Sequence, residues 1–193
     1  LPILLGFVVP TAHLAKLALS SGVLVSDRQF VGDALNSLLL ATVAATIIVG
    51  LAVFLSYAGR LVRHRMLHRT IAFASLGYAI PGAVIAVGVL LPLAFADHGL
   101  DLLSRQLLGV PTGLLLSGTA FALVLAYTVR FLAVGMANVA PGLAAIDPAM
   151  DASARILGAR PREVLWRIHL PMLRAPALTA GIVAFVKVLK ELP

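Results

Sequence analysis

Three long stretches without a single charged residue constrain this chain more than any other feature. Residues 34–59, 71–96 and 106–129 contain no Asp, Glu, Lys or Arg, and each is longer than the roughly 20 residues that a helix needs to cross a bilayer core. Across all 193 residues, 61% are hydrophobic, 12% are charged, and the mean hydropathy is +1.04. These values lie outside the range of soluble domains and predict a membrane protein.

Each span is predicted to be a helix, because backbone in lipid must satisfy its own hydrogen bonds and these stretches are too long for barrel strands. Two weaker spans are expected at the ends, over residues 1–20 and from about residue 175, where charge is absent only as far as residue 186. The predicted fold class is all-α, a polytopic membrane helix bundle with about five spans. The chain starts without Met and stops at Pro193 with no polar tail, so we expect a piece of a longer protein.

The distribution of arginine predicts the orientation of these spans. Residues 60–70 and 136–175 carry nine arginines together, whereas the connections 21–33 and 97–111 carry one each. The nine are Arg60, Arg63, Arg65, Arg69, Arg155, Arg160, Arg162, Arg167 and Arg174, and the other two are Arg28 and Arg105. By the positive-inside rule, residues 60–70 and 136–175 are cytoplasmic. The formal charge of +7 then reflects orientation in the bilayer, and no nucleic-acid partner is expected.

The connection 136–175 contains start and stop signals for two short helices. Asp147 can cap a helix with Pro148 in its first position, and Gly158 is a natural residue just past its end. One face of this helix consists of Ala149, Ala152, Ser153 and Ile156, and such small side chains let another protein approach closely. A second helix is predicted from Pro161 to its end at Pro171, with Trp166 at the membrane interface.

A motif of fixed spacing runs through the same connection. Ala152-Ser153-Ala154 is followed after three residues by Gly158, and after nine more by Ile168-His169-Leu170-Pro171. The pattern resembles the EAA loop of permease subunits of binding-protein-dependent ABC importers, which reads Glu-Ala-Ala, three residues, Gly, nine residues, Ile-x-Leu-Pro. Ala152 stands where that family usually has Glu, and Asp151 supplies an acid one position earlier. The resemblance assigns ATPase coupling to Asp151, Ala152, Ser153, Ala154, Gly158, Ile168, Leu170 and Pro171.

The resemblance implies a six-helix permease core, with residues 1–193 as one incomplete transmembrane domain, the second half of a longer permease, and 136–175 as its coupling loop. It implies a bacterial inner-membrane location and four kinds of partner: a cytoplasmic ATPase dimer, an extracytoplasmic binding protein, a second permease half and the lipid bilayer. It also implies a transport subunit that is not itself an enzyme. This chain would bind no cofactor, and ATP and Mg²⁺ would belong to the ATPase.

Within that family the chain is most similar to ferric-iron permeases. The similarity lies in Leu5-Gly6-Phe7 with Pro10, Leu76-Gly77-Tyr78-Ala79-Ile80-Pro81-Gly82 with Ala86-Val87-Gly88, Tyr127-Thr128-Val129-Arg130-Phe131, and Lys190-Glu191-Leu192-Pro193. Permeases for thiamine, sulfate, molybdate and polyamines share the loop and remain alternatives.

Two groups of residues are candidates for a pathway or gate. Tyr78, Pro81 and Gly82 lie where a Pro-Gly pair would kink or unwind the third span; a plain packing kink is the alternative. Lys187, Lys190 and Glu191 lie within the last span, where charge is costly. Lys187 and Glu191 are one turn apart and can pair, although a watery cavity or a subunit interface would also accommodate these charges. The ferric-iron permeases that this chain resembles tend to have an acid at position 187.

Other classes of function leave no comparable pattern. His64 and His68 have metal-pair spacing but lie among arginines, which favours a solvated loop face, so no metal site is predicted. The three charge-free stretches contain no histidine, and the chain has no cysteine, no Ser-His arrangement and no HExxH motif, so no catalytic site within the membrane is predicted. A channel or membrane scaffold without ATP coupling remains a different-class alternative.

Overall fold

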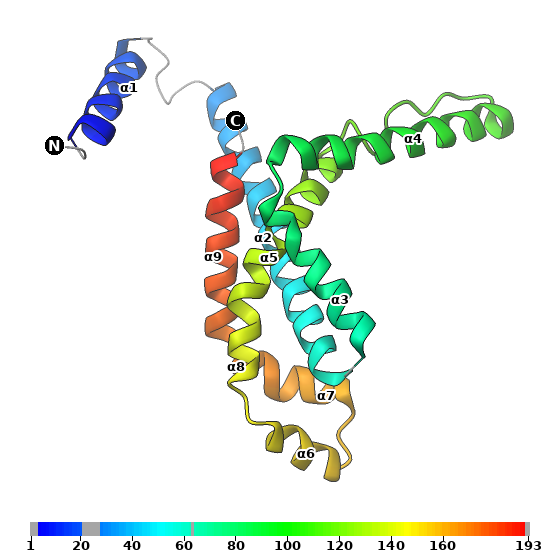
Figure 1. Ribbon diagram of the computed structural model, residues 1–193. Coiled ribbons are helices and arrows are strands. Elements are labelled where there is room, and N and C mark those ends of the chain that lie inside the picture. The colour runs from blue at the N-terminus through cyan, green and yellow to red at the C-terminus, as the bar shows by residue number, and fades with distance from the viewer. Residues whose placement is uncertain (1–3, 21–27, 63, 192–193) are drawn as a thin grey trace. The chain divides into compact units, whose positions relative to one another are not determined.

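Every regular element is helical in the parts of the chain that the computed structural model describes, residues 4–20, 28–62 and 64–191 (Figure 1). The prediction of an all-α protein is confirmed for these residues. The helices are η1 (Leu4–Val8), α1 (Val9–Ser20), α2 (Arg28–Leu61), α3 (Arg65–Ala74), η2 (Ser75–Ala79), α4 (Gly82–Leu108), α5 (Ala120–Ala144), α6 (Pro148–Ile156), α7 (Pro161–Val164), η3 (Leu165–His169), α8 (Leu170–Met172) and α9 (Arg174–Glu191). Most of the expected connection 21–33, Arg63, and Leu192-Pro193 of the C-terminal similarity lie outside the described residues.

The chain divides into two compact units, Leu1–Leu39 and Leu40–Pro193. The first unit contains η1, α1 and the beginning of α2. The second unit contains the remainder of α2 and all later helices. All the residues singled out as candidate sites lie in the second unit.

Three helical segments are long and apolar enough to cross a membrane: Phe30–Leu61, Gly82–Leu108 and Ala120–Ala144. A fourth candidate is the pair Pro161–Met172 and Arg174–Glu191, which is bent by 73°. The described residues thus provide three candidate spans, or four if the bent pair is one, where the sequence predicts five. The expected first span is not among them, since its described part consists of the short helices η1 and α1.

The expected third span, 71–96, is interrupted in its middle. The 3-10 helix η2 ends at Ala79, Ile80 is extended, and α4 begins after Pro81. The predicted interruption at the Pro-Gly pair is confirmed, and it separates α3 and η2 from α4. Pro81 lacks an N–H and its ring restrains the residue before it from helical geometry, so the helix ends there.

The expected fourth span, 106–129, is wrong in its bounds. Gly109 and Gly113 have φ values of 69° and 66°, which end α4 and turn the chain, and the next helix begins only at Ala120. Residues 97–111 were expected to be a connection, but α4 continues through most of them. Asp97 causes this difference: its buried carboxylate accepts hydrogen bonds from the backbone N–H groups of residues 115–117 and from the Ser117 hydroxyl. A charge satisfied in this way does not end a helix.

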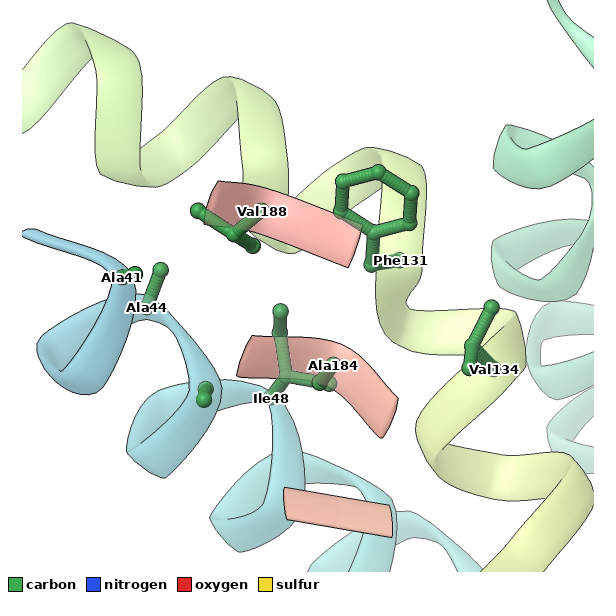
Figure 2. Close-up of a cluster of buried hydrophobic side chains, with 8 residues drawn as sticks. Ala41, Ala44, Ile48, Phe131, Val134, Ala184 and Val188 are labelled. Atoms are coloured by element: carbon green, nitrogen blue, oxygen red, sulfur yellow. The ribbon is translucent and has the colours of Figure 1, made fainter. Parts of the chain in front are cut away.

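The core of the second unit lies where α2, α5 and α9 meet (Figure 2). It consists of Ala41, Ala44, Ala45, Ile48, Phe131, Val134, Ala184 and Val188. Small side chains on α2 and α9 let the helices approach closely, as is common where van der Waals contact holds membrane helices together. Gly135 shows how close: a Cβ there would lie 2.9 Å from Cγ2 of Ile48.

A second apolar cluster joins the ends of α2 and α5 to the short helices that follow. Its buried members are Tyr57, Leu143, Ile146 and Leu173, with Leu165 packed against them. In Figure 1 the segment α6–α8 lies beneath the ends of α2 and α5. The connections 60–70 and 136–175, both predicted to be cytoplasmic, therefore lie at the same end of the bundle.

Candidate functional site

The loop helix α6 forms between the two boundaries that the sequence predicts. The Asp147 carboxylate accepts a hydrogen bond of 2.8 Å from the backbone N–H of Ala149, and Pro148 occupies the first turn. At the other end Gly158 has φ 84°. The N–H groups of Gly158 and Ala159 donate to the carbonyls of Arg155 and Ala154, at 2.9 and 3.0 Å. This pair of bonds is a Schellman motif, which requires a left-handed residue and so explains the glycine.

The predicted small-residue face of α6 is uncovered. Ala149, Ala152, Ser153 and Ile156 are all exposed, whereas Ala154 on the opposite side is buried. Ile156 and Leu157 are each 86% exposed, the highest values among the large apolar side chains that the structure describes. The helix therefore ends in an apolar tip, formed by Ile156 and Leu157, that contacts little else in its own unit.

The second loop helix begins at Pro161 as predicted, with the Arg160 N–H donating to Oε2 of Glu163 at 2.9 Å. It runs through α7, the π-helix η3 and α8 to Met172, so the expected end at Pro171 is wrong by one residue. The wider π turn before Pro171 accommodates a ring that would clash in a regular α-helix. Of the motif residues here, Ile168 and Leu170 are half-buried and Pro171 is exposed, as is Trp166.

A polar group links α6 to the end of α2 and to η3. Oδ2 of Asp151 accepts a hydrogen bond of 2.8 Å from Nε of Arg60, and Oδ1 lies 2.7 Å from Nε2 of His169. Burial alone would raise the pKa of Asp151, but the hydrogen bonds from Arg60 and His169 outweigh it, so this pKa lies below its ordinary value. The Tyr57 ring packs against the ring of His169. We call Tyr57, Arg60, Asp151 and His169 the loop node.

The predicted pathway residues gather around a residue that the sequence reasoning did not single out, Arg130 of α5. Nη2 of Arg130 lies 3.0 Å from Oε1 of Glu191, and its guanidinium occupies the space that a side chain at Gly82 would need. The Lys187 Nζ donates to the Tyr78 hydroxyl at 2.9 Å and lies 4.9 Å from the centre of that ring. The pairing of Lys187 with Glu191, one of the possibilities that the sequence leaves open, is not seen: Lys187 contacts Tyr78 and Glu191 contacts Arg130.

The remaining candidates lie around this group. Pro81 caps the start of α4 and Lys190 is exposed. A cavity of about 350 Å³ is lined by Gly82, Ala83, Ile85, Ala86, Leu123, Ala126, Tyr127, Arg130 and Glu191. Tyr78, Gly82, Lys187 and Glu191 thus come together at the interruption between η2 and α4, while Lys190 stays apart.

The histidines with metal-pair spacing serve a local structural purpose. Nδ1 of His64 accepts from the Met66 N–H at 3.3 Å and caps α3, and Nδ1 of His68 lies 3.2 Å from the His64 carbonyl oxygen. In the described parts of the chain, no three His, Asp or Glu side chains are grouped to hold a metal ion.

Sequence reasoning missed Arg60, His169 and Arg130 as members of sites. Arg60 counted only toward the orientation of the spans, and His169 only as the variable position of the Ile-x-Leu-Pro motif, because their partner Asp151 is 91 and 18 residues away in the sequence. Arg130 entered only as part of the similar segment Tyr127-Thr128-Val129-Arg130-Phe131. One signal was available for Arg130. It directly follows the charge-free residues 106–129, and burying an arginine in a membrane helix is costly unless the arginine has a partner.

Comparison of this chain with models of protein families, with curated proteins and with solved structures gives no match. Its function must therefore be argued from its own residues and geometry.

Proposed function

We propose that this chain is the membrane-spanning permease of an ATP-driven importer, and that α6 is the element through which a cytoplasmic ATPase drives it. The observation that carries the proposal is the form of α6: a capped helix with an uncovered small-residue face, ended by a left-handed glycine, within a loop that matches the EAA spacing. Its position beside Arg60, at the arginine-rich end of the bundle, agrees with a cytoplasmic location.

In this proposal the exposed face of α6 sits in a groove of the ATPase. Closure of the ATPase dimer on ATP moves α6, and α6 moves the ends of α2 and α5 to which it is attached. Transport is then rigid-body switching between inward-open and outward-open packings, biased by ATP and by the loaded binding protein. The chain performs no bond chemistry; ATP and Mg²⁺ act on the ATPase.

Ferric iron is the cargo that we propose, handed over by a periplasmic or lipid-anchored binding protein and passed between this chain and a second permease half. The support is the sequence similarity around residues 76–82 and 127–131, which are the segments that meet where the rings of Tyr78 and Phe131 pack together. Thiamine, sulfate, molybdate and polyamines are the alternative cargoes for a permease of this class.

A channel or scaffold without ATP coupling is the competing function. It would need neither the exposed face of α6 nor a left-handed glycine after it, and it would not co-purify with an ATPase through residues 149–158.

The test is uptake of radioactive ferric iron by cells that express the full-length gene with its neighbouring ATPase and binding protein. Gly158→Val should abolish uptake, because a β-branched residue is strained at φ 84°. Gly158→Asn should retain part of it, since Asn tolerates this conformation. Gly109→Val is the matched control. Gly109 also has a positive φ, 69°, and open space around it, but it lies at the C-terminal end of α4, outside the loop 136–175.

Each outcome decides something. Loss of uptake in Gly158→Val alone supports both cargo and coupling element. ATP-dependent uptake of thiamine or sulfate instead of iron keeps the importer and discards the cargo. Absence of ATP-dependent uptake of all of these solutes favours the scaffold.

A further inference from the structure

We infer that Asp151 is a positioning residue: it fixes α6 to the end of α2 from inside the chain, and so leaves contact with the ATPase to the apolar tip of α6. The inference deepens the proposed function and rests on it for the identity of the partner. The fixation itself is a property of this chain alone.

Arg60 is the centre of the fixation. Its Nε donates to Asp151 at 2.8 Å, Nη1 to the Leu143 carbonyl at 2.6 Å, and Nη2 to the Ile146 carbonyl at 2.8 Å. One guanidinium therefore ties α2 to the end of α5, to the turn that follows it, and to α6. A planar group with several fixed donors can make such a three-way connection, whereas the single ammonium of lysine cannot reproduce its geometry.

Each oxygen of Asp151 is already held by an internal partner. Oδ2 is held by Arg60 and Oδ1 by His169, and the Asp151 side chain is only 15% exposed. His169 is fully buried, so this contact lies inside the chain. An acid held by two internal groups is a poor choice for a salt bridge across an interface, since the ATPase would have to displace one of them.

Tyr57 completes the loop node from the same helix as Arg60. Its hydroxyl donates to the Pro161 carbonyl at 2.7 Å, and its ring lies 5.2 Å from the ring of His169. The last turns of α2 therefore hold the start of α6 through Arg60 and the start of α7 through Tyr57. A displacement of either short helix must displace α2 with it.

The surface left for the ATPase is then small, an apolar tip with the exposed Arg155 beside it. Ile156 and Leu157 are exposed, and Ala152 and Ser153 beside them carry no charge. We expect a partner groove that accepts apolar side chains and needs no cation opposite position 151.

The fixation is tested by double electron–electron resonance on purified full-length protein in nanodiscs, without any partner. These 193 residues contain no cysteine. Once any cysteine elsewhere in the full-length protein is replaced, spin labels at Val62→Cys and Ser153→Cys, both exposed, report the separation of α6 from the end of α2. We expect a narrow distance distribution, broadened in Asp151→Asn and in Arg60→Gln. The matched controls are Asp147→Asn on the same helix, because Asn also caps, and Arg155→Gln, an exposed arginine of α6.

Equal widths in all of these variants would overturn the inference. If Arg60→Gln fails to fold, Arg60→Lys keeps the charge but loses the three-way geometry, and should still broaden the distribution.

Coupling is measured separately, as solute imported per ATP hydrolysed by the assembled transporter. Asp151→Asn should lower this ratio several-fold while the ATPase still co-purifies, and Ile156→Ser combined with Leu157→Ser should abolish co-purification. Loss of co-purification in Asp151→Asn alone would place Asp151 in the interface and refute the inference. A narrow, Asp151-dependent distance distribution in a protein that transports nothing would refute the proposed function and leave the fixation standing.

Discussion

At the scale of single residues, this chain gives its charges different tasks according to their partners. The carboxylates of Asp97 and Asp151 are both largely buried and each has both oxygens hydrogen-bonded, yet Asp97 holds the returning chain after α4 and Asp151 holds helix α6 of the connection 136–175. Charge in an apolar chain is tolerated where backbone N–H groups or a guanidinium satisfy it. What each charge does follows from those partners.

The lowered pKa of Asp151 gives a prediction with a definite sign. Because the folded state favours the charged carboxylate, its stabilisation is complete above the ordinary pKa of 3.8 and is lost as the pH falls through the lowered value. We expect the wild-type protein to be more stable than Asp151→Asn by about 2 kcal/mol near neutral pH, and this difference to shrink below about pH 4.

Thermal unfolding in detergent across this pH range measures the difference. Asp147→Asn serves as the reference, because it removes a carboxylate from the same helix while keeping a capping group. A wild-type advantage that grew on acidification would show that the assigned direction is wrong.

At the scale of elements, the contact of η2 with α5 depends on one glycine. A Cβ at Gly77 would collide with the backbone carbonyl of Val129, which cannot move without moving α5, whereas a Cβ at Gly82 would meet only the flexible end of Arg130. Gly77→Ala should therefore cost about 1–3 kcal/mol of stability, the usual range for overpacking, and Gly82→Ala clearly less.

Unfolding midpoints of the two variants test this order, with Gly88→Ala as the control, since open space surrounds Gly88. Gly77→Ala should also weaken the contact of Tyr78 with Lys187, because it lifts η2 from α5. Equal midpoints for Gly77→Ala and Gly82→Ala would mean that η2 is not held in this close contact.

The elements differ in how far the sequence could predict them. Helix α6 was predicted to within one residue, because caps such as Asp147 and Gly158 are local signals. The bounds of the third and fourth spans were wrong because absence of charge does not reveal where a helix is interrupted. Their true limits depend on Pro81, on glycines with positive φ, and on buried Asp97, whose partners lie 18 to 20 residues further on.

The candidate sites differ in the same way: local features could be predicted from the sequence, and contacts between distant residues could not. The exposed face of α6 could be predicted because it depends on periodicity within nine residues. The loop node and the pairing of Arg130 with Glu191 could not, since each joins helices that are far apart in sequence and depends on how those helices pack.

At the scale of the whole molecule, orientation in the membrane is open to direct measurement. With the loops 60–70 and 136–175 inside, single cysteines at Val62 and Ser153 should react with a membrane-impermeant thiol reagent only after cells are permeabilised. A cysteine at exposed Leu114, in the turn between α4 and α5, should react in intact cells. The full-length protein must first be freed of any other cysteine.

Labelling of Ser153→Cys in intact cells would show that the predicted orientation is wrong and that α6 lies out of reach of a cytoplasmic ATPase. The positions were chosen because all three are exposed and lie outside the three long apolar helices.

The three hydrogen bonds of Arg60 also bear on how this chain can diverge over time. Two of its acceptors are main-chain carbonyls, of Leu143 and Ile146, which every amino acid possesses. Mutations at those two positions can accumulate as long as the side chains still fill the apolar cluster, whereas positions 60 and 151 can change only as a compensated pair. In an alignment of homologues, positions 60 and 151, which lie 91 residues apart, should therefore covary. Covariation of position 60 with positions 143 and 146 should be far weaker, because Arg60 contacts only their carbonyls.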